Sequence, residues 1–106
     1  MDNLEVAMGL IAGAGDSRSY CMEAIECARE GQFDEARDAL KSAVSAMVET
    51  HEVQTQLIRD EIEGKGEAVS LIMVHAQDHL NLALIMRDIA EEFITLYERV
   101  KKLEEK

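Results

Sequence analysis

The chain has 106 residues, of which 22 are acidic and 11 basic, giving a formal net charge of −11 at pH 7. That charge repels phosphate backbones and anionic lipid headgroups, which argues against nucleic-acid and membrane-surface roles and favours a protein partner with a basic or neutral face. The length allows one domain, residues 1–106, and the absence of proline and tryptophan among many Ala, Glu, Leu and Met residues predicts an all-α fold.

A first helix is expected from about residue 3 to residue 30, where Gly31 provides a natural end. Gly9 and Gly13 lie four residues apart within this helix. Each costs about 1 kcal/mol relative to alanine in a helix interior. The pair therefore indicates either close approach of a second helix or a frayed, poorly helical first segment, and the sequence alone leaves both possibilities open.

A second and a third helix follow. Phe33 and Asp34 predict the start of the second, with Asp34 as N-cap and Phe33 as the apolar residue before it, and the pattern continues to about Ile62. Glycines interrupt residues 63–66, and a third helix is expected over about 67–102. Short connections place successive long helices antiparallel, so the monomer is predicted to be an up-down-up three-helix bundle.

The third expected helix is apolar on two opposite sides. Between residues 69 and 84, one side carries Val69, Met73, Ala76, Leu80 and Leu84. The other side is a longer stripe made of Ala68, Leu71, Ile72, Leu82, Met86, Ile89, Phe93, Leu96, Tyr97 and Val100. A helix that is apolar all round must be buried all round, which two neighbours in a small bundle cannot provide. This predicts a homo-oligomer with the third helix close to a symmetry axis.

Three ionisable residues, His75, Asp78 and His79, fall inside the longer stripe at positions i, i+3 and i+4, which are neighbours on a helix surface. Unpaired polar groups in an interface cost several kcal/mol, so a role is expected for them. A neutral histidine with one nitrogen held by a hydrogen bond is a nucleophile suited to accepting a phosphoryl group. A histidine pair beside a carboxylate also suits zinc or another transition metal. A hydrogen-bonded polar layer that fixes helix register is the third possibility.

The residues themselves argue against two specific metalloenzymes. Ala76 follows His75 where a zincin has glutamate, and the Glu-x-x-His pairs of a di-iron bundle do not occur.

The segment 70–80, SLIMVHAQDHL, resembles the enzyme IIA component of the lactose/cellobiose (and chitobiose) branch of the bacterial phosphoenolpyruvate-dependent sugar phosphotransferase system. Nearly the whole chain shares the resemblance. The other similar positions are Leu10-Ile11 through Gly15 with Arg18 and Ser19, then His51, Gln54, Thr55 and Leu57, and finally Glu92 to Tyr97. One departure is Asn81-Leu82, where the family commonly has a Met-Thr-like pair, and this would alter the groove wall and partner preference.

The resemblance implies a phosphoryl carrier. A histidine at the position of His75 accepts the phosphoryl group on Nε2 from the carrier protein HPr. It then passes the group to a cysteine of enzyme IIB during uptake of a β-linked disaccharide such as lactose, cellobiose or chitobiose. The resemblance also implies a homotrimer in which the aspartate matching Asp78 meets its two copies at a shared divalent ion, usually described as magnesium. Asp78 is thus expected to be a structural metal ligand rather than a catalytic base.

His79 is the nearest candidate for a donor that stabilises the phosphoryl group on His75. Gln77 is a weaker candidate because it projects toward the other side of the helix, and His51 is expected to be structural. A histidine phosphotransfer domain is one alternative, but those domains need a lysine and a glycine close behind the histidine, and nothing basic follows His75 before Arg87. A structural trimeric adaptor and a metal-storage or metal-sensing bundle using His75 and His79 are the others.

Cys21 and Cys27 are six residues apart on one expected helix, so they point in different directions and should both be reduced thiols.

No stretch approaches the roughly 18 consecutive apolar residues of a membrane span, and the N-terminus has no basic and apolar leader pattern. These features predict a soluble, cytoplasmic protein.

Overall fold

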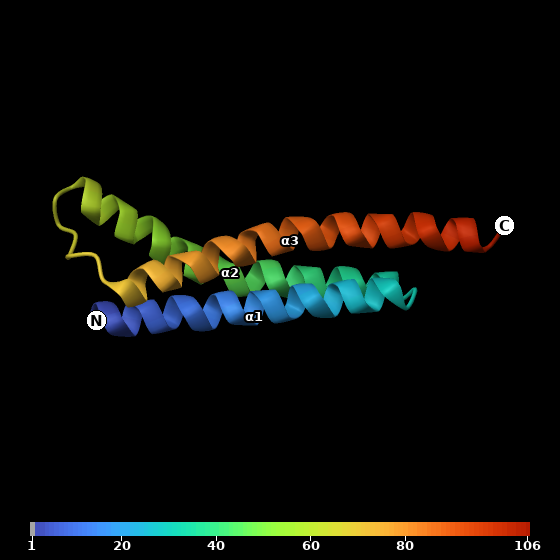
Figure 1. Cartoon of the computed structure of the whole chain (residues 1–106), viewed down its shortest axis with the longest axis horizontal. Helices are drawn as coiled ribbons and strands as arrows, with labels where there is room; N and C mark the ends of the chain where they lie inside the picture. Colours follow the sequence, from blue (N-terminus) through green and yellow to red (C-terminus); the bar gives the residue numbers. More distant parts are fainter. Residues whose placement is uncertain (1) are drawn as a thin grey trace.

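The structure, a computed structural model, describes residues 2–106 and contains three helices: α1 over Asn3–Arg29, α2 over Phe33–Ile62 and α3 over Leu71–Glu104. No strand occurs in the described part of the chain, so the all-α prediction is confirmed there. α2 runs back along α1, and α3 then runs in the direction of α1 (Figure 1). The result is a rod of 61 × 20 × 20 Å with its termini at opposite ends.

Gly31 closes the short turn between α1 and α2. Gly31 adopts a φ of +80°, and the N–H of Gln32 donates to the carbonyl of Cys27 over 2.9 Å, which closes the end of α1 as predicted. Gln32 then caps α2, with its carbonyl accepting from the N–H of Ala36, so the prediction of Asp34 as N-cap was wrong. Asp34 instead lies in the first turn, where its charge faces the positive end of the helix dipole.

The start of α3 was also predicted wrongly, by four residues. The helix begins at Leu71, after Ser70, whose Oγ accepts from the N–H of Met73 over 3.3 Å. Before it, residues 65–70 are not helical, and the backbone at Gly66 lies so close to α2 that a Cβ there would be 3.0 Å from the Cα of Glu61. A serine cap at the helix start therefore outweighs the apolar pattern that suggested Glu67.

α1 lies at the centre of the packing. It contacts both α2 and α3 extensively, whereas α2 and α3 contact each other much less. At the crossing of α1 and α2, a Cβ on Gly13 would overlap the hydroxyl group of Thr50, so this glycine permits close approach of the two helices. Gly9 has no neighbour within 4 Å of an added Cβ, and α1 is helical through both positions. The close-approach interpretation thus holds for Gly13, while the frayed alternative is wrong.

The core is thin and rich in alanine. Its fully buried members include Ala7, Leu10, Ala14, Cys21, Ala24, Ala36, Ala43, Ala76, Leu80, Ala83, Ala90 and Ile94. Alanines let the helix backbones approach closely but bury little area each. A buried hydrogen bond, from Ser17 Oγ to the carbonyl of Ala43 over 2.8 Å, adds a polar link between α1 and α2.

Much apolar surface of α3 faces outward in the single chain. Its exposed large apolar residues are Leu71, Val74, Leu82, Ile85, Ile89, Phe93, Leu96, Val100 and Leu103, and we call this set the α3 stripe. Residues such as Ala76 and Leu80, on the opposite side of α3, fill the core instead. The total exposed surface is 7200 Å². A compact protein of 11.8 kDa exposes roughly 5,900 Å², so the rod has a large surface for its mass.

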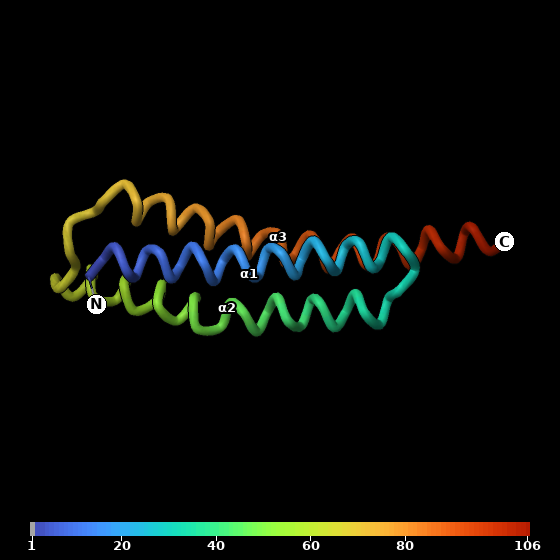
Figure 2. Tube along the Cα trace, turned by 90° about the horizontal axis from the view of Figure 1, so that it is seen from below, coloured from blue at the N-terminus to red at the C-terminus, as the bar shows by residue number. Residues whose placement is uncertain are grey.

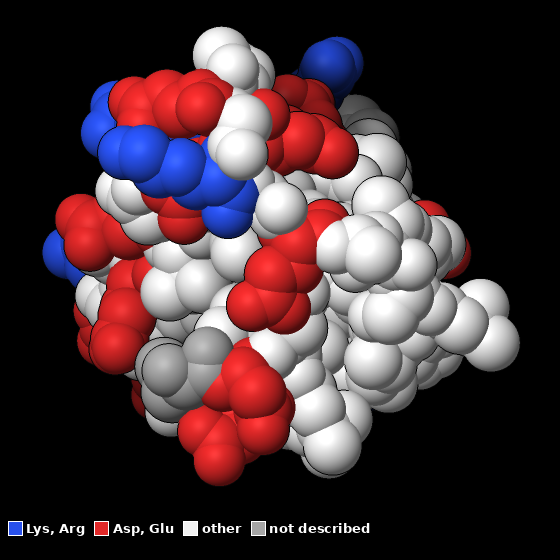
Figure 3. Space-filling model, turned by 90° about the vertical axis from the view of Figure 1, so that its left-hand side faces the viewer, with Lys and Arg blue, Asp and Glu red and all other residues white. Residues whose placement is uncertain are grey.

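The last turns of α3 extend past the turn between α1 and α2 (Figure 2). An end view from the side of the N-terminus and the α2–α3 connection shows acidic groups over one part of the surface and a broad area free of charged side chains beside them (Figure 3). No helix within residues 2–106 combines the length and apolar character that a membrane crossing requires.

Candidate functional site

The rings of His75 and His79 meet one helical turn apart, near the start of α3. Their Nε2 atoms are 3.0 Å apart, and the ring centroids are 4.5 Å apart with an interplanar angle of 84°. Two neutral imidazoles can share this hydrogen bond only if one Nε2 carries the proton and the other offers its lone pair. The helical spacing of four residues thus creates a donor–acceptor pair of histidines.

The two rings differ in burial. His75 is exposed, whereas His79 is half-buried and its Nδ1 is buried with no hydrogen-bond partner among residues 2–106. The contact with His75 is therefore the hydrogen bond that orients the His79 ring. When His79 Nε2 donates this bond, His75 Nε2 is unprotonated and its lone pair accepts the bond. This lone pair, on an exposed ring, can act as a nucleophile once the His79 N–H turns away.

Asp78 lies on the exposed side of α3 but does not join the histidine pair. Its carboxylate makes no hydrogen bond or ion pair within the described part of the chain. Nor do residues 2–106 form any cluster of three or more His, Cys, Asp or Glu side chains with the arrangement of a metal site. Of the three predicted site residues, a single chain therefore brings together only His75 and His79.

Gln77 points away from the histidines, as expected, and links α3 to α2. Gln54 Nε2 donates to Gln77 Oε1 over 2.7 Å, and Gln77 Nε2 lies 3.7 Å from Met73 Sδ. Gln77 follows His75 by two residues, about half a helical turn, so this bridge holds α3 against α2 close to the level of the histidine pair. Sequence reasoning treated Gln54 only as part of a motif and missed the pairing, although Gln77 lies on the core side of α3.

His51 is exposed on α2, and its imidazole makes no hydrogen bond to any residue in 2–106. Its backbone carbonyl accepts from Thr55 Oγ1 over 3.0 Å, an interaction within α2. The surroundings of His51 among residues 2–106 therefore provide no hydrogen-bond partner that would activate its imidazole ring.

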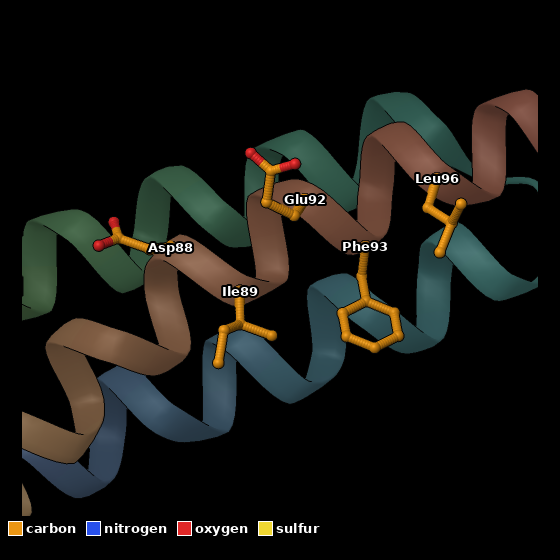
Figure 4. A pocket seen from close by; sticks show the side chains of 5 residues that line it. All are labelled: Asp88, Ile89, Glu92, Phe93 and Leu96. Atoms are coloured by element: carbon orange, nitrogen blue, oxygen red, sulfur yellow. The ribbon is translucent and has the colours of Figure 1, made fainter.

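A shallow hollow of about 370 Å³ lies further along α3, within the α3 stripe. It is lined by Asp88, Ile89, Glu92, Phe93 and Leu96, all from α3 (Figure 4). Ile89 and Phe93 point to one side of the helix, while Asp88 and Glu92 point to the other. A hollow formed by one helix face is a surface suited to another helix rather than an enclosing small-molecule pocket.

Both cysteines are free thiols, as the sequence predicted. Burial raises the pKa of Cys21, and the nearby Arg87 guanidinium offsets part of this rise. Burial also raises the pKa of Cys27, with a further rise from surrounding carboxylates, first that of Glu23. Neither thiol is therefore activated as a nucleophile, which leaves the histidine pair as the candidate reactive group.

Comparison with known proteins adds independent information. A sequence model of the family described as "PTS system, Lactose/Cellobiose specific IIA subunit" matches residues 5–98. The lichenan-specific phosphotransferase enzyme IIA component of Bacillus subtilis is 41% identical over 96 residues, which cover 91% of this chain and 87% of the relative. The N,N'-diacetylchitobiose-specific EIIA component of Escherichia coli K12 is 43% identical over 98 residues, covering 92% and 84%.

Solved structures give the same result. The cellobiose-specific enzyme IIA from Bacillus anthracis has a TM-score of 0.91 and 37% identity, covering 96% of this chain and 94% of that one. The IIA component of the N,N'-diacetylchitobiose branch of Escherichia coli, solved in complex with HPr, has a TM-score of 0.80 and 36% identity, covering 95% and 98%.

Proposed function

Because the chain belongs to the lactose/cellobiose-specific IIA family of the sugar phosphotransferase system, we propose that it carries a phosphoryl group on His75. HPr is the donor, and a cysteine of enzyme IIB is the acceptor. The observation that supports this most directly is the exposed His75 ring, whose Nε2 lies 3.0 Å from Nε2 of the half-buried His79. The relative solved together with HPr supports the choice of donor.

In the transfer step, the Nε2 lone pair of His75 attacks the phosphorus atom of phospho-HPr. A new N–P bond forms as the bond between phosphorus and HPr breaks, and the proton on His75 Nδ1 stays in place. To release this lone pair, His79 Nε2–H turns from the His75 nitrogen to a phosphoryl oxygen as the attack begins, and there it stabilises negative charge. Phosphoryl transfer depends mainly on such positioning and electrostatic stabilisation. Transfer to the cysteine of enzyme IIB reverses these bond changes.

The transported sugar is proposed to be a β-linked disaccharide, such as lactose, cellobiose or chitobiose, and the protein to act in the cytoplasm. Similar proteins are named as EIIA components specific for lactose, cellobiose or N,N'-diacetylchitobiose. A carrier that exchanges phosphoryl groups only with HPr and enzyme IIB makes no contact with the sugar, so the site residues themselves do not select among these substrates.

The functional unit is proposed to be a homotrimer built on the α3 stripe. Leu82 is 54% exposed and Ile85 56% exposed in the single chain, an unfavourable arrangement that helix association would remove. Three copies of Asp78 would then meet near the axis, where their charges repel strongly in a low dielectric. The free carboxylate of Asp78 fits Mg²⁺, which prefers oxygen ligands in octahedral geometry and would neutralise this repulsion.

The proposal is tested by following labelled phosphate from phosphoenolpyruvate through enzyme I and HPr to the purified protein. The wild type should acquire acid-labile, alkali-stable label, and His75→Ala should acquire none. His51→Ala is the matched control, because it removes an exposed histidine with no partner, and it should be labelled normally. Label on His75→Ala, or none on the wild type with active HPr, would overturn the proposal.

A further inference from the structure

We propose that His75 and His79 also form a binding site for a divalent transition-metal ion, and that metal and phosphoryl group exclude one another. The binding site follows from the geometry of the two rings. The exclusion rests on the proposed function, because it requires His75 Nε2 to be the phosphoacceptor.

The separation of the two Nε2 atoms sets the geometry of the ion. Metal–nitrogen bonds to histidine are about 2.0–2.1 Å long, so nitrogens 3.0 Å apart would subtend an angle of roughly 91–97° at the ion. This is close to the angle between adjacent ligands in square-planar or octahedral complexes, the geometries of Cu²⁺ and Ni²⁺. A tetrahedral Zn²⁺ site would need the nitrogens about 3.3 Å apart, so zinc would require the rings to separate slightly.

The orientation of the rings is compatible with a shared ion. Their centroids are 4.5 Å apart and their Nε2 atoms 3.0 Å apart, a difference of 1.5 Å. Two imidazoles meeting end to end would have centroids farther apart than this, so the Nε2 atoms are inclined toward a common side. A cation placed there would replace the single proton between the two Nε2 atoms, and that proton would move to Nδ1 of the same ring, so that both rings stay neutral.

The surroundings leave the remaining coordination positions to water. His75 is exposed, and no third His, Cys, Asp or Glu completes a cluster within residues 2–106. The net charge of −11 favours the approach of a cation. The proposed centre thus has two protein ligands, both imidazole nitrogens. It differs in metal preference from an oxygen site at Asp78, because imidazole nitrogen favours nickel and copper while carboxylate oxygen favours magnesium.

Occupation of this site has a direct chemical consequence. The metal–nitrogen bond uses the lone pair of His75 Nε2, which is the pair that would form the N–P bond. A metal-loaded chain therefore has no nucleophile to offer phospho-HPr, and a phosphorylated chain has lost one of its two metal ligands. Transition-metal ions should act as reversible inhibitors of phosphoryl transfer at this step.

Calorimetric titration of the purified protein with Ni²⁺ tests the binding site. Excess Mg²⁺ is present throughout to fill oxygen sites. We expect one Ni²⁺ per chain, with at least about tenfold weaker binding after His75→Ala or His79→Ala, because each leaves one ligand. His51→Ala, which removes a third histidine outside the pair, should bind as the wild type does. Equal affinities for wild type and His79→Ala would overturn the metal site.

Phosphoryl transfer in the presence of Ni²⁺ tests the exclusion. The rate of transfer from pre-formed phospho-HPr should fall in proportion to Ni²⁺ occupancy and recover when a chelator is added. Unchanged transfer at full occupancy would overturn the exclusion. If the metal-free protein accepts no phosphate at all, the proposed function fails, while the titration still decides the metal site separately.

Discussion

At the residue scale, the site depends on two histidines that a continuous helix places one turn apart. Their Nε2 atoms meet at 3.0 Å, and the remaining nitrogen of His79 has no partner within residues 2–106. Changes at His79 should therefore affect the state of His75 directly, without an intervening residue. This makes His79 the most informative position after His75 itself.

Replacement of His79 by alanine removes the donor that would stabilise the phosphoryl group. A hydrogen bond to a charged group contributes about 1.5–3 kcal/mol, so His79→Ala should slow phosphorylation by roughly tenfold to a hundredfold. His79→Gln, whose amide nitrogen can still donate, should recover part of the rate. Quenched-flow measurement with pre-formed phospho-HPr provides the rates, and equal rates for wild type and His79→Ala would exclude a role for this ring.

The thiols provide a second prediction at this scale. Burial raises the pKa of Cys21, so little thiolate exists near neutral pH, and the side chain is fully buried. Iodoacetamide should modify the half-buried Cys27 first, with a rate that rises as pH increases, while Cys21 reacts only after unfolding. Mass spectrometry of digested samples measures both, and rapid labelling of Cys21 in the native protein would contradict the packing described.

Sequence spacing was sufficient to predict that His75 and His79 would be neighbours, because four residues make almost one helical turn. It also suggested that Asp78 lies within reach of His75, yet the two side chains form no hydrogen bond or ion pair among residues 2–106. The spacing fixes which positions share a helix face but not which rotamer a side chain adopts, and no hydrogen-bond partner among residues 2–106 orients Asp78.

At the element scale, helix ends were harder to predict than helices. The apolar pattern located all three helices, but α3 begins at Leu71 rather than Glu67, and α2 is capped by Gln32 rather than Asp34. Hydrogen bonds at single residues determine these ends, such as the bond that Ser70 Oγ accepts from the N–H of Met73. The periodic pattern contains no information about them.

The crossing of α1 and α2 provides a prediction with an internal control. Gly13→Ala would push a methyl group into the hydroxyl of the buried Thr50, and overpacking of this kind costs about 1–3 kcal/mol. Gly9→Ala meets no neighbour and should be neutral or stabilising by up to about 1 kcal/mol, since alanine favours helix. Thermal unfolding at one fixed protein concentration compares the two variants.

The double variant Gly13→Ala, Thr50→Ala is the further test, because removal of the hydroxyl and methyl groups of Thr50 should restore most of the lost stability. If Gly13→Ala unfolds at the same temperature as Gly9→Ala, the close approach of α1 and α2 at this point is wrong.

At the scale of the whole molecule, the three-helix packing buries only one of the two apolar sides of α3. α1 shields one side of α3, and the α3 stripe leaves the other side to solvent in the single chain. The sequence predicted this imbalance, since α3 is apolar on two sides and a small bundle can cover only one. The number of chains in the predicted homo-oligomer depends on contacts between chains, and the structure of a single chain does not include these contacts.

Asp78→Leu tests the proposed assembly. Replacement of a polar layer at an interface by an apolar one often stabilises by about 1–4 kcal/mol, so the variant should remain trimeric, with equal or greater stability, and lose the shared magnesium ion. Sedimentation equilibrium and metal analysis measure these properties. Ile89→Lys, on the same α3 stripe, should instead yield monomers, because it places a charge among apolar side chains. If Asp78→Leu is monomeric, the proposed homotrimer is wrong.

An NMR spectrum of the histidine ring nitrogens decides whether His75 Nε2 carries the phosphoryl group. It is recorded on uniformly ¹⁵N-labelled protein before and after addition of catalytic HPr, enzyme I and phosphoenolpyruvate. We expect a large shift and phosphorus coupling at Nε2 of His75, a smaller change at His79 next to it, and no change at His51. Coupling at Nδ1 of His75, or at either of the other two histidines, would contradict it.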